Sequence, residues 1–166
     1  MTLTFVYYSR YVQSAWTTCP YVVRDGKLNP DVRQLNGVNA IADVTQSVLY
    51  NALTAVLTTD PAEAKMSGEN VADFIQTFFL DEKVGMYPEI AYGQVIRGPG
   101  TQHGQYLGIL DFRGMVKVVN AILLMKAGKA AGWTSSMDSQ MVAWSKQYVK
   151  WLATSDLGKT ASSSSK

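Results

Sequence analysis

The sequence predicts an all-α protein. Apolar residues recur at intervals of three and four in four segments, near residues 40–58, 60–80, 112–127 and 135–154. This spacing is typical of helices with one buried face. No strong alternating pattern of the kind that predicts a strand lies between them. Because consecutive helices follow one another through short links, we expect antiparallel hairpins, which can build a bundle, a solenoid or a toroid.

The first two helices have recognisable starts. Asn39 is a reasonable N-cap for the first. The second is expected to begin at Asp60 and Pro61, with Glu63 completing a capping box, and Gly68 should weaken it by about 1 kcal/mol relative to alanine. The two apolar stripes consist of Ile41, Val44, Val48, Leu49, Ala52, Leu53, Val56 and Leu57, and of Val71, Phe74, Ile75, Phe78 and Phe79.

The third and fourth helices also carry apolar stripes. The third is expected to end at Gly128, and the fourth to begin near Ser135 or Ser136. Aromatic and Met residues at helical spacing are typical of a core rather than of a cofactor site. The stripes consist of Met115, Val118, Val119, Ile122 and Leu123, and of Met137, Met141, Trp144, Tyr148, Trp151 and Leu152. Across the four helices, we expect burial of Val48, Leu53, Phe78, Val119 and Trp144.

The two ends of the chain lack the helical pattern. Residues 2–8 and 21–23 are compatible with short extended pieces, and DGKLNPD, residues 25–31, consists of turn-forming residues. The serine-rich residues 160–166 are expected to be frayed, since they offer little apolar surface for packing.

Composition narrows the classes of function. With 166 residues, 47% of them apolar, the chain is long enough for one domain with a core. The net charge is +2, and Lys and Arg are scattered without the basic run that a nucleic acid partner requires. No apolar run comes near the roughly 18 residues of a membrane span, and the first residues do not resemble a signal peptide. We therefore expect neither nucleic acid nor membrane as a partner.

Two reactive residue types occur only once, which limits the chemistry. Cys19 has no second cysteine to pair with, and His103 is the only histidine. A disulfide within the chain, a cysteine- or histidine-rich metal site and a two-histidine mechanism are therefore excluded. Ligation by carboxylates alone is possible in principle, but Asp and Glu show no metal-loop pattern. We expect no metal and no other cofactor.

The segment from Gly93 to Met115, GQVIRGPGTQHGQYLGILDFRGM, differs from the rest of the chain. Glycine and proline at this density break helices and let the backbone approach a ligand closely. Arg97 and Arg113 are fixed cations that suit a bidentate grip on a carboxylate. These features favour a loop over residues 93–108 that lines a concave surface, with Arg97 pointing into it. The alternative is a long connection between helices whose glycines only turn corners.

Several segments, in their order and spacing, resemble the alginate lyase domain of the polysaccharide lyases. They are CPYVVRDGKLNPDVRQLNG, QSVLYNALTAVL, YGQVIRGPG, GQYLGILDFRGMVKVVNAI and WSKQYVKWLATSDLGK. The resemblance covers roughly residues 19–166, taken as the N-terminal part of such a domain, and leaves residues 1–18 as a variable segment. It implies a partial (α/α) toroid built of antiparallel helical hairpins. It also implies an extracellular or periplasmic protein that is a monomer in its full-length form.

The resemblance further implies a reaction and its substrate. Lyases of this type cleave an anionic uronate polysaccharide by β-elimination and need no redox cofactor. In this chain, Gln94, Arg97 and Arg113 are the candidates to bind a carboxylate, and His103 and Tyr106 are the candidates for base and acid. The family's Asn-Asn-His-Gly motif normally follows a segment like KTASSSSK, where this sequence stops. We therefore expect a fragment that is inactive by itself.

Each candidate also has a purely structural alternative. Arg113 can pair with Asp111, and His103 can be an exposed loop residue. Tyr92 and Tyr106 can be packing residues. The rival function is a non-catalytic helical domain that binds carbohydrate or a protein partner.

Overall fold

The computed structural model describes residues 3–5, 21–23, 37–94 and 104–164. Over these residues the predicted all-α class is confirmed, with two three-residue strands as the only extended pairing that they contain. In chain order the elements are β1 (Leu3–Phe5), β2 (Tyr21–Val23), α2 (Gly37–Leu57), α3 (Pro61–Ile75), the π-helix η2 (Gln76–Leu80), the 3-10 helix η3 (Tyr106–Gly114), α4 (Met115–Ala127), α5 (Ser135–Thr154) and α6 (Asp156–Ser164).

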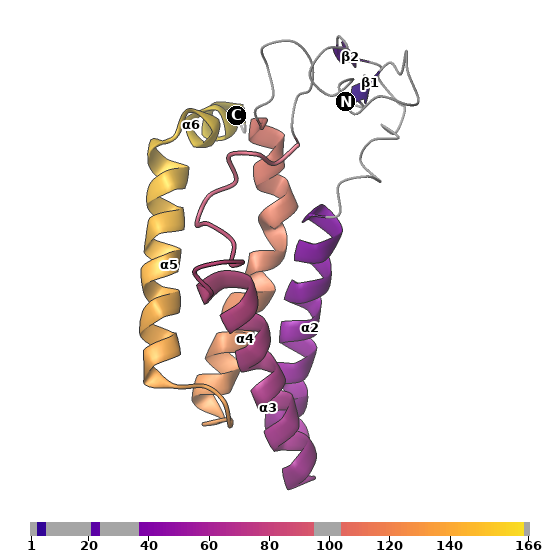
Figure 1. The fold of residues 1–166 in the computed structure, drawn as a ribbon, viewed down its shortest axis with the longest axis vertical. Helices are drawn as coiled ribbons and strands as arrows, with labels where there is room; N and C mark the ends of the chain where they lie inside the picture. Colours follow the sequence, from indigo (N-terminus) through magenta and orange to yellow (C-terminus); the bar gives the residue numbers. More distant parts are fainter. Residues whose placement is uncertain (1–2, 6–20, 24–36, 95–103, 165–166) are drawn as a thin grey trace.

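Successive long helices, from α2 to α5, run in opposite directions, and α6 lies across the end of α5 (Figure 1). α2 packs against α3 and α4, while η3 packs against α2, α4 and α6. β1 and β2 pair antiparallel with Leu3 opposite Val23, as the short extended pieces suggested. α2 and α3 pack as a predicted antiparallel hairpin, whereas α2 and α4, which also pack together, run parallel. Closure into a toroid stays a prediction.

α3 begins where the sequence predicts, and α2 begins earlier. The Asp60 carboxylate caps α3 by accepting hydrogen bonds from two N–H groups of its first turn (2.8 and 3.4 Å). Thr58 donates its hydroxyl hydrogen to Glu63, which ties the end of α2 to α3. α2 already begins at Gly37, so Asn39 lies inside its first turn and is not the cap.

The glycine-rich segment becomes helical earlier than its apolar stripe indicates. The stripe predicts a helix from about residue 112, whereas η3 already begins at Tyr106 and α4 continues it from Met115. In a 3-10 helix, residues three apart lie on the same side, so the 3.6-residue pattern does not detect it. Phe112, which is buried, and Ile109 illustrate this spacing.

The serine-rich end is helical, so the prediction of a frayed segment is wrong as far as Ser164. The Ser155 hydroxyl accepts a hydrogen bond from the Gly158 N–H (3.0 Å) and so caps α6. Thr160 donates its hydroxyl hydrogen to the Asp156 carbonyl, and Ser164 to the Thr160 carbonyl (both 2.8 Å). This helix has no apolar stripe. It is stabilised instead by polar side chains that bond their own helix backbone and by packing on α5 and η3.

The core lies between α2, α3, α4 and α5, and two of its predicted members are deeply buried. Val48 and Trp144 are almost inaccessible, while Leu53 and Phe78 are half-buried. Aromatic rings meet edge to face at its centre, with 5.2 Å between the centroids of Phe79 and Trp144. The most deeply buried apolar residues are Val48, Ala52, Val71, Ile75, Phe79, Phe112, Val118, Ala121, Met125 and Met141.

The predicted burial of Val119 is wrong. Its side chain is 46% exposed, and that of Leu123 is 58% exposed. α4 is apolar around most of its circumference, so its sequence allows more than one buried face. The face that packs contains Val118, Ala121 and Met125, whereas Val119 and Leu123 line a hollow between α4 and α5.

Gly68, which in the sequence looks like a weak point of α3, has a packing role. A Cβ at this position would come within 2.4 Å of the Ala131 carbonyl oxygen. The connection between α4 and α5 therefore lies directly against the α3 backbone. Any larger residue at this position would push the connection away.

Residues Asn39–Leu57 of α2 meet the length and composition of a membrane span, with a mean hydropathy of 1.2 over an 18-residue window. The core helix of a globular fold meets the same criteria. In the structure, α2 packs against α3 and α4 and buries Val44, Val48 and Ala52. Buried residues make up 22% of the window, and the expectation that no segment spans a membrane stays a prediction.

Candidate functional site

The glycine-rich segment is closed at its base by backbone contacts. The Gly104 N–H donates to the Ala91 carbonyl, and the Gln105 N–H donates to the Gly93 carbonyl (both 3.0 Å). A Cβ on Gly108 would come within 2.5 Å of the Gly93 carbonyl carbon. Glycine at both positions permits this approach. The two ends of the segment are therefore fixed side by side where η3 begins.

Gln94 lies at this base and is held by an acidic neighbour. Its φ of 51° is left-handed, which is uncommon for a residue other than glycine. Its side-chain Nε2 donates to Oδ2 of Asp111 (2.8 Å). Burial raises the pKa of Asp111 above its ordinary 3.8, while the Gln94 hydrogen bond and the charge of Arg113 act in the opposite direction. Beyond this bond the amide has a carbonyl oxygen, an acceptor, and a second N–H hydrogen, a donor.

Tyr106 and Arg113 lie near the two ends of η3. Tyr106 directly follows the clamped Gln105 and is half-buried. Arg113 is exposed, and its Nη1 donates to the Leu110 carbonyl (3.4 Å). Its positive charge acts to lower the pKa of Asp111. This agrees with the alternative in which Arg113 is a structural partner of Asp111. The exposed guanidinium remains suited to a carboxylate.

Another tyrosine, Tyr148 on α5, belongs to the core. Its ring stacks on Trp144 with 5.8 Å between centroids and meets Phe112 edge to face at 5.0 Å. Burial raises the pKa of Tyr148 to about 12. Its phenol is therefore kept protonated and is a poor candidate for a base.

Two of the predicted site residues, Arg97 and His103, lie outside the described residues. Their roles stay predictions, as does the expected direction of the Arg97 side chain. The structure does describe the clamped base of this segment and η3. Their hydrogen bonds hold Gln94 next to Asp111 and next to the start of η3.

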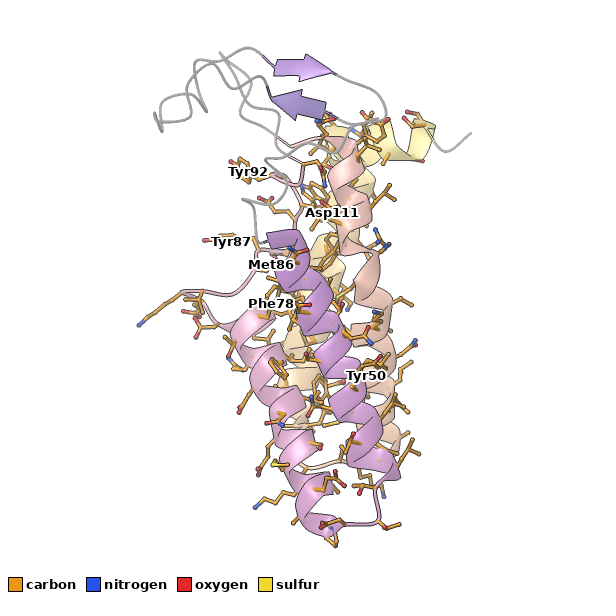
Figure 2. All side chains as sticks on the ribbon, turned by 90° about the vertical axis from the view of Figure 1, so that its right-hand side faces the viewer. Tyr50, Phe78, Met86, Tyr87, Tyr92 and Asp111 are labelled. Carbon is orange, nitrogen blue, oxygen red and sulfur yellow. The ribbon has the colours of Figure 1, made fainter. Side chains whose placement is uncertain are left out.

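A groove of about 440 Å³ opens beside Gln94. Apolar side chains dominate its walls, among them Ile41 of α2. Tyr87 and Tyr92, which are 77% and 72% exposed, extend from the same side of the molecule in Figure 2. We call it the tyrosine groove, and its principal lining residues are Ile41, Met86, Tyr87, Glu89, Ile90, Tyr92, Gln94 and Asp111.

The wall that carries the two tyrosines is held in place by hydrogen bonds. Asp81 caps the turn after η2 by accepting from two backbone N–H groups (2.7 and 3.0 Å). The Met86 N–H donates to the Phe78 carbonyl (2.7 Å). The Trp144 indole N–H donates to the Met86 carbonyl (2.9 Å) and so links this wall to α5.

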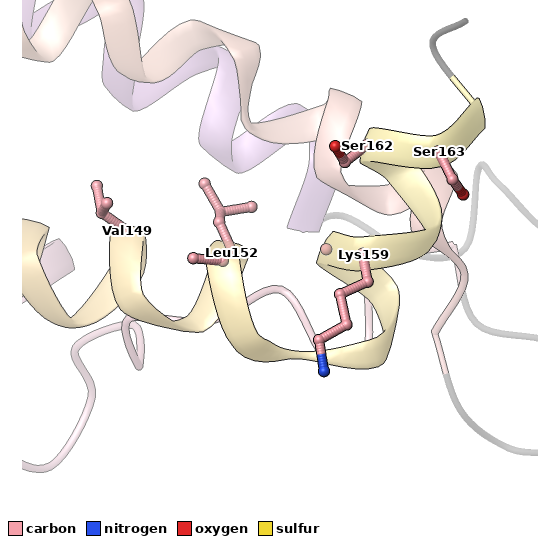
Figure 3. Close-up of a pocket in the computed structure, with 7 residues that line it drawn as sticks. Val149, Leu152, Lys159, Ser162 and Ser163 are labelled. Atoms are coloured by element: carbon pink, nitrogen blue, oxygen red, sulfur yellow. The ribbon is translucent and has the colours of Figure 1, made fainter.

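Two further hollows contain none of the predicted site residues. One of about 450 Å³ lies between α4 and α5, with Leu123 and Val142 in its lining. The other, of about 510 Å³, lies where α5 meets α6, and Figure 3 shows Leu152, Lys159 and Ser162 around it. Both include Val149, so they form neighbouring parts of one surface.

Sequence reasoning missed some of the groove. It did not single out Tyr87, and it treated Asp111 only as a partner for Arg113. Tyr92 was weighed as a packing residue, and its exposure contradicts that alternative. The available signal was two tyrosines outside any helical stripe, one of them beside Pro88.

The described residues contain no group of three or more His, Cys, Asp or Glu side chains that could hold a metal ion. Glu89 and Asp111 line the same groove, but a third ligand of that kind is not present in this part of the chain. The side chains that the described site offers are those of tyrosine, arginine, glutamine and carboxylate residues.

Comparison with known proteins gives a family. The alginate lyase family matches residues 4–165. The structure also resembles a solved alginate lyase from Bacteroides ovatus, with a TM-score of 0.73 and 28% identity, over 84% of this chain and 35% of that one. The chain thus spans about a third of the length of the solved lyase. Comparison with curated proteins gave no match. Because the family match extends over nearly the whole sequence, the chain belongs to the alginate lyase family.

Proposed function

We propose that the chain forms part of an enzyme that cleaves a uronic-acid polysaccharide by β-elimination. The observation that carries this proposal is the family match over residues 4–165. The likeness to the Bacteroides ovatus alginate lyase supports it. Enzymes of this kind meet such polymers outside the cell, and we propose the same location for this protein.

The reaction sets three tasks. A group must neutralise the uronate carboxylate, so that the neighbouring C5 proton becomes acidic. A base must remove that proton, and the electron pair left behind forms the C4–C5 double bond as the C4–oxygen bond breaks. An acid must then protonate the leaving glycosidic oxygen. Fixed hydrogen-bond donors suit the first task, and tyrosine or histidine suits the other two.

We assign these tasks to the glycine-rich segment and η3. Arg97 and Arg113 are the proposed carboxylate ligands, because a guanidinium offers paired donors. His103 and Tyr106 are the proposed base and acid. Gln94 is the third proposed substrate ligand, and its donation to Asp111 leaves its carbonyl oxygen and one amide hydrogen for the sugar.

The test needs the rest of the fold, since the match covers about a third of the solved lyase. Residues 1–166 would replace the matched third of the Bacteroides ovatus enzyme, and the ultraviolet absorbance of the unsaturated uronyl product would report turnover on alginate and on glucuronan. We expect the chimera to be active and residues 1–166 alone to show no appreciable activity.

Variants of the chimera identify the catalytic groups. Tyr106→Phe should lower the turnover rate by about a hundredfold or more, which is typical of losing a general acid or base. Tyr50→Phe, on the exposed side of α2, is the matched control and should have no effect. A folded chimera without activity on either polymer would refute the lyase function. Equal rates for the two variants would remove Tyr106 from the mechanism.

A further inference from the structure

We propose that the tyrosine groove binds one sugar ring of the polymer by its uncharged face and hydroxyl groups, and not by its carboxylate. The inference rests on the proposed function for the kind of polymer. It goes beyond that function by assigning a binding role to Tyr87, Tyr92 and Asp111, and by separating the ring contacts from the carboxylate contacts.

The shape and composition of the groove suit a sugar ring. Its volume of about 440 Å³ is in the range of small-molecule pockets. Ile41, Met86 and Ile90 give it an apolar wall, and the C–H face of a pyranose is itself apolar. Tyr87 and Tyr92 add two large, mostly exposed rings. Aromatic rings with a polar tip suit a ligand that is apolar on one side and wet on the other.

The polar groups of the groove include several acceptors beside the tyrosine hydroxyls and the Gln94 amide. Asp111 retains acceptor capacity beyond the single hydrogen bond from Gln94. Gln94 in turn presents its carbonyl oxygen, and Glu89 adds a second carboxylate to the lining. Sugar hydroxyls are donors that can satisfy these oxygens, whereas a uronate carboxylate is itself only an acceptor.

The charge of the groove also disfavours a carboxylate inside it. Glu89 and Asp111 are acidic, and the described residues that line the groove include no Lys or Arg. The charge of Arg113, which is not part of the lining, acts on Asp111 and offsets part of this negative charge. A uronate carboxylate placed here would meet charges of its own sign, one on the partly buried Asp111 and one on the exposed Glu89, which is unfavourable. The ring is therefore expected to lie with its carboxylate directed out of the groove.

The groove is largely formed before a ligand arrives. The Glu89 N–H donates to the Tyr87 carbonyl (2.7 Å) around Pro88, and the Gly93 N–H donates to the Ile90 carbonyl (3.4 Å). These turns fix the backbone at both tyrosines. A fixed backbone reduces the ordering cost of binding.

Binding to residues 1–166 tests the inference without requiring turnover. The ligands are a mannuronate hexamer and the mannose hexamer obtained by reducing its carboxylates, measured by calorimetry at low and high salt. Tyr87→Ala and Tyr92→Ala should each raise the Kd about tenfold, as expected for truncating an aromatic anchor. The increase should be the same for both hexamers and at both salt concentrations. Tyr50→Ala, a tyrosine further along α2 (Figure 2), should leave the Kd unchanged.

Three outcomes would overturn the inference: an unchanged Kd in both tyrosine variants, an effect confined to the acidic hexamer, or an equal loss with Tyr50→Ala. Circular dichroism confirms that each variant is folded, which exposed positions should permit. The proposed function is judged separately. Groove effects with both hexamers but no unsaturated product from the chimera would reject the lyase and keep the groove. Unsaturated product from the chimera with no change of Kd in the tyrosine variants would support the lyase and reject the groove.

Discussion

Gly108 lies against the backbone of Gly93 at the base of the glycine-rich segment. An added Cβ would meet the Gly93 carbonyl carbon at 2.5 Å, a distance at which the backbone must move. This contact holds Gln94 and the start of η3 in register, because the neighbouring Gln105 N–H bonds the Gly93 carbonyl. Single backbone contacts of this kind determine where the site residues lie.

Gly108→Ala is therefore expected to destabilise the fold by about 1–3 kcal/mol, the usual cost of overpacking. The matched control is Gly37→Ala, because a Cβ at Gly37, the first residue of α2, would meet no atom within 4 Å. Its effect should stay within about 0.5 kcal/mol. Urea unfolding of the two variants measures both, and equal stabilities would contradict the contact.

The burial of Asp111 predicts how the free energy of unfolding changes with pH. Its folded-state pKa is raised above 3.8, so between the two values the folded state binds more protons than the unfolded state. The contribution of Asp111 to the free energy of unfolding is then fully present below pH 3.8. It is lost as the pH rises through the raised folded-state value.

Asp111→Asn should remove this dependence and keep an acceptor for Gln94. We expect the variant to be at least as stable as the wild type at neutral pH and to lose less stability as the pH rises from 3.8. Unfolding free energies measured over a pH series give the comparison. The other carboxylates cancel in the difference, so parallel curves would show that Asp111 is not perturbed.

At the scale of elements, α3 shows how a local signal defines a boundary. The Asp60 carboxylate accepts from the first-turn N–H groups, and Pro61 occupies a position where its missing N–H has no cost. These interactions involve only neighbours in sequence. For that reason the start of α3 could be predicted, whereas the start of η3 depends on contacts with distant residues.

Asp60→Ala should lower the free energy of unfolding by about 1 kcal/mol through loss of the cap. Asp73→Ala is the matched control, since Asp73 is an exposed acidic residue within the same helix. Its effect should be within about 0.5 kcal/mol. Thermal unfolding monitored at the helical signal compares the two, and a loss of similar size in both would argue against the cap.

At the scale of the whole molecule, apolar surface extends along α4 and α5 towards α6. Leu123, Val142 and Val149 are 58%, 45% and 62% exposed, and the two hollows on this side share Val149. We call this surface the α4–α5 strip. Contiguous apolar surface of this kind promotes association. The solved Bacteroides ovatus lyase is about three times as long as the part of it that matches this chain. In that lyase, additional chain is available to cover an apolar surface of this kind.

We expect residues 1–166 to self-associate with rising concentration, and Leu123→Lys with Val149→Lys to reduce the association. Val84→Lys is the control, because Val84 is 70% exposed but lies in the turn after η2, away from the strip. Light scattering over a concentration series measures the mass, and circular dichroism checks the helix content. An equal reduction by Val84→Lys would show that general charge, and not the strip, controls association.

The sequence by itself determined the helical class, the four long helices and the cap of α3, because periodicity and capping are local properties. It also indicated the family, since the matching segments keep their order. It gave Gln94, Tyr106 and Arg113 as candidate site residues by residue type and position in the glycine-rich segment, and their roles stay proposals.

Only the tertiary structure decided which face of α4 is buried, why Gly68 is a glycine, and that residues 160–164 are helical. It also placed Tyr87, Tyr92 and Asp111 around one groove. The physical reason is the same in each case. These features arise where segments distant in sequence meet, and the energy of such a contact depends on both partners, while a sequence pattern describes only one.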